Sequence, residues 1–316
     1  MFNGIINVYK EKGFTSHDVV AKLRGILKQK KIGHTGTLDP DAEGVLPVCL
    51  GGGTKLCDMI TDRSKEYEAV MLLGLCTDTE DISGKTLARY DVDTDEETLR
   101  GIIMSFVGEY DQIPPMYSAI KVNGKKLYEL ARAGREIERK PRRVTVDYLE
   151  ITEISLPRVK FRVGCQKGTY IRSLCRDIGE KAGCGACMES LVRTRVGDFR
   201  LDDAHTLSQI EALAGSGELS GIITPIDAYF KDCPAITLSG REAALVKNGN
   251  MFSETGGVIR QHGLGAGEIS SADKVEDGAR FRVYLSERGI RNFAGIYEYD
   301  RSRRAYKPVK MFLSGE

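Results

Sequence analysis

One carboxylate in this chain lies in a segment that leaves its backbone little freedom. Asp39 falls within residues 33–47, GHTGTLDPDAEGVLP. Its three glycines allow sharp turns, and Pro40 favours an extended conformation at Asp39 itself. A carboxylate held in one direction suits a nucleophile or a general base. An isolated Asp-Pro pair is more often simple turn chemistry, so the segment alone leaves both interpretations open.

Two other segments carry side chains that complement such a carboxylate. In residues 64–67, SKEY, Tyr67 offers an aromatic face for stacking a base and a hydroxyl for moving a proton. In residues 167–174, KGTYIRSL, Arg172 offers a charge that would favour the ionised form of a neighbouring carboxylate. Spacing alone favours a core tyrosine and an exposed helical arginine, so these roles need further support.

Together these motifs resemble the TruB family of pseudouridine synthases, over nearly the whole chain. Residues 114–132, PPMYSAIKVNGKKLYELAR, are similar to the family's flexible insertion that closes on tRNA. The resemblance implies that Asp39 is the catalytic carboxylate, that Tyr67 lies against the target base and that Arg172 pairs with Asp39. It also implies the reaction: the N1–C1′ bond of uridine breaks, the uracil rotates, and a bond forms through C5, with no external cofactor. Whether Asp39 attacks the base, attacks the sugar or removes a sugar proton stays open.

The resemblance extends to residues that would bind the substrate. His34 would occupy the space left by a flipped uridine, and Leu191 would line the pocket, although a plain core leucine explains Leu191 equally well. Lys10 and Tyr170 lie in family segments expected to bind substrate. At residues 9–13, YKEKG, the family's usual proline after the lysine is absent, so this segment lacks its usual stiffening.

Charge is polarised along the chain although the net charge is only +1. Residues 121–143 contain nine lysines and arginines against three glutamates, a net charge of +6, whereas residues 77–97 contain eight acidic against two basic residues, a net charge of −6. A basic stripe is typical of a phosphate-binding surface, and also of an ordinary solvated face. The expected contacts with the RNA backbone are Lys121, Lys125, Lys126, Arg132, Arg142 and Arg143.

Composition bounds the class of protein. A chain of 316 residues with 41% hydrophobic content can form two domains, and it contains neither an apolar run of roughly 18 residues nor a signal-peptide pattern. We therefore expect a cytoplasmic protein whose eight cysteines are reduced. Cys184 and Cys187 form a C-x-x-C pair near Cys175, but no second half of a metal site accompanies them, so no metal is expected.

Two other patterns are set aside. Residues 51–55, GGGTK, reverse the order that a phosphate-binding loop requires. The remaining histidines show no ligand spacing and are interpreted as structural or surface residues: His17, His205 and His262.

Periodicity predicts the main elements. We expect strands at 5–9, at 67–75 starting with Tyr67, and at 158–165, and helices capped by Thr15, Asp95 and Thr169, the last ending near Gly183. A linker is expected at 225–234, then a helix at 239–248 ending at Gly249, a glycine-rich loop at 256–267, and strands at 280–285, 295–299 and 306–312.

The resemblance implies an α+β fold. Its parts would be a mixed, largely antiparallel sheet with flanking helices, in residues 1–230 with an insertion at about 113–143, and a small PUA-like β-barrel domain in residues 235–316. The expected reaction converts uridine 55 in the T-loop of tRNA to pseudouridine after base flipping. The alternatives are the same chemistry on another RNA and a non-catalytic RNA-binding or tRNA-folding protein. We expect the tRNA T-arm as partner, no membrane, no required protein partner and a monomer.

Overall fold

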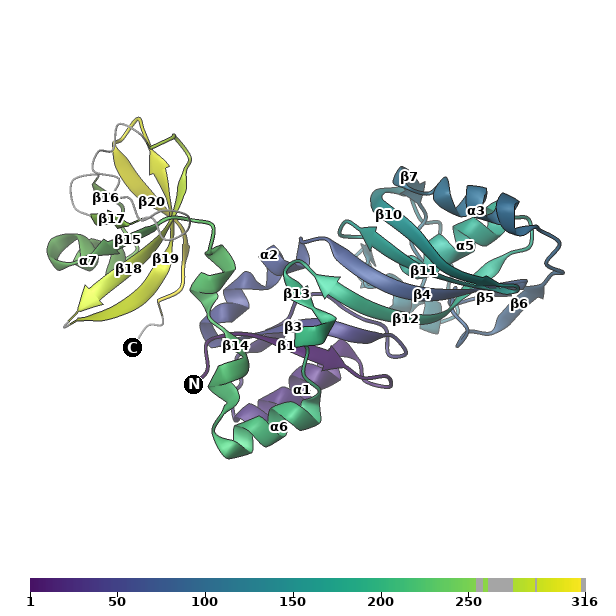
Figure 1. Cartoon of the computed structure of the whole chain (residues 1–316), viewed down its shortest axis with the longest axis horizontal. Helices are drawn as coiled ribbons and strands as arrows, with labels where there is room; N and C mark the ends of the chain where they lie inside the picture. The colour runs from purple at the N-terminus through teal and green to yellow at the C-terminus, as the bar shows by residue number, and fades with distance from the viewer. Residues whose placement is uncertain (254–257, 261–274, 288, 314–316) are drawn as a thin grey trace.

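Two large sheets dominate the protein, which is elongated, with its C-terminal sheet at one end (Figure 1). The structure is a computed structural model that describes residues 1–253, 258–260, 275–287 and 289–313. The expected glycine-rich loop at 256–267 lies mostly, and His262 entirely, outside these residues.

The large sheet has ten strands. Its order is β14 (Ile223–Thr224), β1 (Gly4–Lys10), β3 (Glu43–Leu50), β12 (Ala186–Val196), β4 (Lys65–Leu73), β11 (Arg158–Cys165), β10 (Arg142–Ser155) and β7 (Gly108–Gln112), with β2 (Ile32–His34) on β3 and β13 (Phe199–Arg200) on β12. Only the β12–β3 pair is parallel among its described pairings. The expected α+β architecture with a mixed, largely antiparallel sheet is confirmed.

Helices cover the two halves of this sheet separately. The α-helices are α1 (Ser16–Leu27), α2 (Cys57–Thr61), α3 (Glu96–Met104), α4 (Leu127–Arg132), α5 (Ile171–Lys181), α6 (Leu207–Ser216) and α7 (Gly240–Lys247). Helices α1 and α6 share an apolar core with β1–β3, and α3 and α5 share another with β4 and β10–β12. The 3₁₀ helices are η1 (Gly51–Leu56), η2 (Leu201–Asp203), η3 (Leu219–Ile222) and η4 (Ile226–Phe230).

A curled sheet of six strands forms the C-terminal part, as expected for a small β-domain (Figure 1). Its order is β16 (Phe252–Ser253), β20 (Ala305–Met311), β19 (Ile290–Asp300), β18 (Arg280–Glu287), β15 (Ala235–Leu238) and β17 (Val258–Arg260). Two small hairpins complete the structure: β5 (Leu75–Thr77) with β6 (Thr86–Arg89), and β8 (Lys121–Val122) with β9 (Lys125–Lys126).

Several predicted elements are confirmed together with their local causes. Thr15 caps α1 in a capping box with Asp18, and Asp95 caps α3 by accepting from the Thr98 N–H. Residues 158–165 form β11 with alternating burial. The C-terminal helix and the last three strands also lie where the sequence predicts them.

Three predictions need correction. Strand β4 begins at Lys65 rather than Tyr67, and it ends at Leu73 because Gly74 has a φ of 82°. Thr169 does not cap α5; its hydroxyl donates to the Gln166 carbonyl, and Tyr170 is the N-cap residue without a side-chain cap. The predicted polar linker contains η4, whose Ile226 and Phe230 are buried in an apolar cluster shared by both sheets.

The features set aside in the sequence have structural roles. Gly53 packs against the start of β1, since a Cβ atom there would lie 2.4 Å from the Gly4 carbonyl oxygen. Cys175, Cys184 and Cys187 are buried free thiols. Among the described residues, no helix is long and apolar enough to cross a membrane.

Candidate active site

The loop that carries Asp39 joins two paired strands. Strands β2 and β3 are antiparallel, so residues 35–42 form the turn between them. The Leu38 N–H donates to Ser16 Oγ at 2.9 Å, and both the N–H and the hydroxyl of Thr35 donate to the Pro47 carbonyl. The loop is therefore anchored at its start and its middle, as the sequence predicts for a firmly held carboxylate.

Asp39 faces Arg172 across the site. Arg172 Nε lies 2.9 Å from Asp39 Oδ2, and Arg172 Nη2 donates to Asp39 Oδ1 at 3.2 Å. This two-point contact fixes the plane of the carboxylate as well as its position. The side chain of Asp39 is 36% exposed and that of Arg172 only 5% exposed, so the pair is closed on the arginine side and open on the aspartate side.

Backbone carbonyls hold Arg172 from two other directions. Its Nη1 donates to the Thr79 carbonyl at 2.9 Å, and its Nη2 donates to the Tyr117 carbonyl at 2.9 Å. The Asp81 carboxylate lies 3.8 Å from Nη1. A helical arginine that spacing alone would leave on the surface is thus buried and held by three separate segments.

Burial and charge act in opposite directions on Asp39. Burial raises the pKa of the Asp39 carboxyl above its usual value, and the Asp81 charge adds to this increase, while the charges of Arg172 and Lys10 lower the pKa. Burial dominates. Arg172 favours the ionised form, as the sequence predicts, but it does not restore an ordinary pKa.

Tyr67 lies on β4, in the same apolar cluster as Leu38 and Leu191. It is 9% exposed, and burial raises its pKa to about 12. The Tyr67 hydroxyl therefore carries its proton at neutral pH. Leu191 is buried on β12, the strand beside β4, where it pairs with Ala69.

Two other expected substrate residues, His34 and Tyr170, are partly exposed. His34 is partly exposed at the end of β2, 5.1 Å from the His17 ring, and burial lowers its pKa. Tyr170 is partly exposed, and its backbone N–H and carbonyl both bond the Gln112 side chain. Both residues therefore keep part of their surface accessible.

Lys10 differs from the expectation of a direct substrate contact. It is fully buried, and its ammonium donates to the carbonyls of Glu11, Phe14 and Pro40, the residue after Asp39. All three of its donors are thus used within the protein. Burial also lowers its pKa to about 8. Lys10 thus supports the Asp39 loop through its bond to the Pro40 carbonyl.

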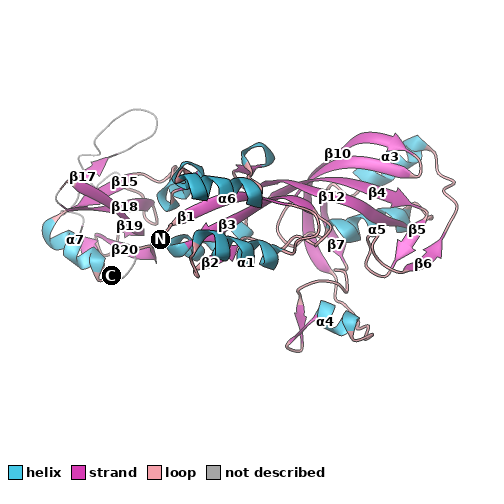
Figure 2. Ribbon diagram, turned by 90° about the horizontal axis from the view of Figure 1, so that it is seen from below, coloured by secondary structure: helices cyan, strands magenta, loops and turns pink. Residues whose placement is uncertain are grey.

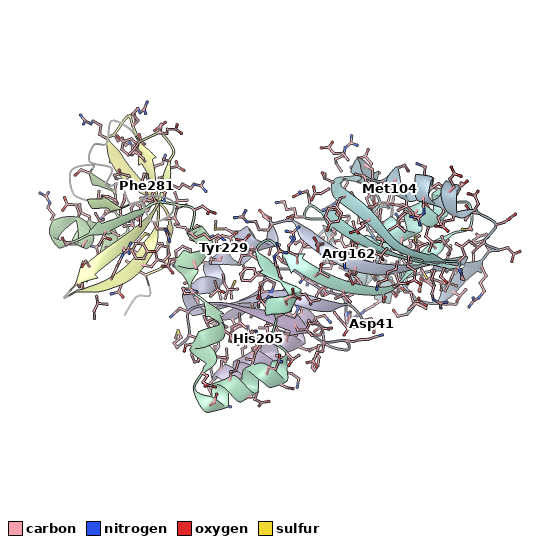
Figure 3. All side chains as sticks on the ribbon, in the orientation of Figure 1. Asp41, Met104, Arg162, His205, Tyr229 and Phe281 are labelled. Atoms are coloured by element: carbon pink, nitrogen blue, oxygen red, sulfur yellow. The ribbon has the colours of Figure 1, made fainter. Side chains whose placement is uncertain are left out.

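The middle of the basic insertion, which carries β8, β9 and α4, stands away from the body of the large sheet (Figure 2), whereas Arg142 and Arg143 lie at the start of β10 within it. Lys126 and Arg132 lie over the Tyr128 ring, and Arg143 is 3.5 Å from Asp111 in an exposed ion pair. Lys121, Lys125 and Arg142 are exposed. Asp41, two residues after Asp39, lies near the middle of the long molecule, towards the half of the sheet that carries α3 and α5 (Figure 3).

Sequence reasoning missed two charged members of this site: Asp81, one of the acids of the segment 77–97, and Arg193, two residues after Leu191. In the structure Asp81 approaches Arg172, and Arg193 is buried beside Tyr67. The inward position of Arg193 could be inferred from its even spacing from Leu191 on one strand.

Comparison with known proteins shows the family of this chain. Residues 24–171 match the family model described as TruB family pseudouridylate synthase, N-terminal domain, and residues 172–231 match tRNA pseudouridylate synthase B, C-terminal domain. A protein of Lachnoclostridium phytofermentans named tRNA pseudouridine synthase B is 51% identical, with 98% of this chain and 100% of that protein covered. A Bacillus subtilis protein of the same name is 46% identical over 80% of this chain and 84% of its own length.

Solved structures share the fold. A Cbf5-Nop10-Gar1 complex contains a chain with a TM-score of 0.69 and 28% identity, covering 98% of this chain and 85% of that chain. A chain in an H/ACA RNP bound to a substrate RNA containing 2′-deoxyuridine has a TM-score of 0.68 and 26% identity, at the same coverage. These matches define a pseudouridine synthase, which is an isomerase. The chain belongs to the TruB family.

Proposed function

We propose that this enzyme converts uridine 55 in the T-loop of tRNA to pseudouridine, and that Asp39 is the residue on which the reaction depends. The observation that carries the proposal is the Asp39–Arg172 pair, whose aspartate side is open while its arginine side is buried. The curated relatives named tRNA pseudouridine synthase B support tRNA as the substrate.

The proposed reaction keeps every atom of the uridine. The target base leaves the stack and enters the site, with His34 in the space that it leaves and Tyr67 and Leu191 against it. Asp39 acts as nucleophile or base at the base or the sugar while the N1–C1′ bond breaks, and the uracil rotates before C5 joins C1′. Tyr67, protonated at neutral pH, can help to move the C5 proton.

Arg172 and Lys10 keep the carboxylate in position during these steps. Arg172 contacts both carboxylate oxygens, and Lys10 bonds the carbonyl of the next residue. Tyr170, partly exposed at the start of α5, is proposed to contact the substrate. The basic residues of the insertion are proposed to bind phosphates of the T-arm: Lys121, Lys125, Lys126, Arg132, Arg142 and Arg143. We further propose that residues 1–230 form the catalytic domain, that residues 235–316 form an RNA-binding domain, and that the enzyme acts as a cytoplasmic monomer.

Tritium release tests the proposal directly. A tRNA transcript labelled at C5 of uridine should release tritium with the wild-type enzyme, and a transcript with cytidine at position 55 should release none. Asp39→Asn should react roughly 10² to 10⁴ times more slowly, while it still binds the transcript. Asp41→Asn is the matched control, because Asp41 is an exposed aspartate of the same loop. Wild-type enzyme that is silent on several tRNAs would refute the proposal.

A second candidate is the same chemistry on another RNA. The structural similarity to a chain of an H/ACA RNP that is bound to a substrate RNA favours it. Turnover of tRNA by the purified chain alone would argue against a required partner. Mapping pseudouridine in total RNA from a deletion strain would identify the substrate, and loss at tRNA position 55 alone is the expected result.

A further inference from the structure

Arg193 is a buried cation that the proposed reaction steps do not use. It lies on β12, is 1% exposed and is the largest fully buried side chain among the described residues. A guanidinium keeps its charge in a protein, so burial without compensation is costly. The buried charge of Arg193 therefore needs interactions within the protein that compensate for the lost hydration.

Its partners are few and specific. Arg193 Nε donates to the Val45 carbonyl at 2.7 Å, and its Nη2 is buried without a hydrogen-bond partner in the described structure. No carboxylate of the described residues forms an ion pair with it. Tyr67 is its partner across the β12–β4 ladder, and the charge of Arg193 lowers the pKa of the Tyr67 hydroxyl against the larger effect of burial. The charge of Arg193 therefore interacts with Tyr67 and is not neutralised by an acid of the described residues.

Strand pairing brings Arg193 and Tyr67 together. Arg193 pairs with Tyr67 in the β12–β4 ladder and with Gly44 in the parallel β12–β3 pair. A Cβ atom at Gly44 would lie 2.2 Å from the Arg193 carbonyl oxygen, so only glycine allows β3 to approach this closely. Arg193 Nη1 is 3.8 Å from the position that a Cβ atom of Gly36 would take, in the loop of Asp39. Arg193 thus lies between the strand of Tyr67 and the loop of Asp39.

We propose that Arg193 is a positioning residue, which holds the hydroxyl and ring of Tyr67 in the orientation that faces the base. This inference rests on the proposed function. Arg193 acts through Tyr67 and makes no contact with the RNA, because its side chain is enclosed.

A double-mutant cycle tests this coupling. Arg193→Met removes the charge at similar volume, and it is measured in the wild-type and in the Tyr67→Phe background by single-turnover tritium release with enzyme in excess. With Tyr67 intact we expect a loss in rate of about 10-fold and a nearly unchanged KM for tRNA. In Tyr67→Phe the same substitution should change the rate by less than about twofold, because the hydroxyl that Arg193 holds is absent. Arg193→Lys, which keeps a donor and the charge, should recover part of the rate.

Controls separate this role from folding. Arg195→Gln alters an arginine of the same strand that pairs with Glu66 at 3.6 Å, and it should leave the rate unchanged. Melting temperatures of all variants are recorded, so that a loss of rate caused by a loss of stability is recognised. Equal losses in both backgrounds, or a loss that follows the melting temperature, would overturn the proposal.

A second readout needs no turnover. In protein labelled with ¹³C on the tyrosine rings, the Tyr67 signal is the one lost in Tyr67→Phe. Arg193→Met should shift that signal and Arg195→Gln should not; an unshifted signal in Arg193→Met would count against the proposal. Wild-type enzyme without activity on tRNA would refute the proposed function, whereas an active enzyme with no coupling would refute only the role of Arg193.

Discussion

Helix α5 presents two arginines one turn apart, Arg172 and Arg176, and the two make opposite kinds of ion pair. Arg172 is 5% exposed and faces a carboxylate that is 36% exposed. Arg176 is 17% exposed, and its partner Glu80 is only 9% exposed. The first pair is open on its acidic side, whereas the second is enclosed on both sides.

The surroundings of the second pair explain the difference. Arg176 also contacts Asp177 at 2.6 Å and donates to the Ile113 carbonyl at 3.0 Å, while Glu80 accepts from the Ser173 hydroxyl at 2.6 Å. Every oxygen of Glu80 is engaged within the protein. This pair fastens the turn around Glu80 and the start of the insertion to α5, while the Asp39 pair leaves its carboxylate accessible for chemistry.

Of the variants that test this difference between the two pairs, Arg172→Gln should lower the reaction rate most. It removes the two-point contact with Asp39, and a carboxylate displaced by about 1 Å is expected to slow tritium release roughly 100-fold. Rates on the labelled transcript measure this. Arg158→Gln is the control, because Arg158 makes an equally close contact with Glu189, at 2.8 Å, on the surface. An unchanged rate in Arg172→Gln would show that the open pair has no catalytic importance.

The same variant should shift the pH dependence of the reaction. Burial already raises the pKa of Asp39, and the charge of Arg172 lowers it, so removal of Arg172 raises the pKa further. If the carboxylate must be ionised, the rate is lost as pH falls through the pKa, and this loss should begin at higher pH in Arg172→Gln than in wild type. Single-turnover rates across the acidic range measure the shift. A shift to lower pH would contradict the proposed role of the charge.

Arg176→Gln should affect stability instead. It leaves the enclosed Glu80 without its cation, and breaking such a pair is expected to cost about 3 kcal/mol of unfolding free energy. Urea denaturation measures this cost, with Arg100→Gln, which breaks an exposed pair with Glu96, as the control. The folded fraction should keep a rate within a few-fold of wild type. If Arg176→Gln lost as much rate as Arg172→Gln, the enclosed pair would not be merely structural, and the distinction between the two pairs would fail.

Lys125→Ala should have the smallest effect. Lys125 is exposed on the insertion, so its loss should weaken tRNA binding a few-fold and reduce the slope of log affinity against log salt by roughly 1. Filter binding at several salt concentrations measures the slope. Lys85→Ala, which removes an exposed lysine from the acidic segment, should leave the slope unchanged. Equal slopes for both variants would argue against an RNA contact at Lys125.

Local patterns predicted much of this molecule from the sequence. The alternation in residues 158–165 and the cap at Thr15 each depend on neighbours within a few positions, so both could be predicted before the fold was known. The cap at Thr169 failed because the Thr169 hydroxyl donates to the Gln166 carbonyl, while the N–H of Tyr170 donates to the side chain of Gln112, which is 58 positions away in the chain. The firm hold on Asp39 was also predictable from local sequence, because proline and glycine restrict or free the backbone next to them.

The partners of Asp39 required the tertiary structure. Arg172 lies 133 positions away from it in the chain, and spacing alone placed that arginine on the surface. Its burial depends on α5 packing over the sheet beside the turn at Thr79 and the start of the insertion. Likewise Arg193 meets Tyr67 only because β12 lies between β3 and β4. The sequence by itself determined which side chains could do chemistry, since residue type sets pKa and hydrogen-bonding capacity. The tertiary structure decided which of them meet, because strand order and burial bring together charges that are distant in the chain.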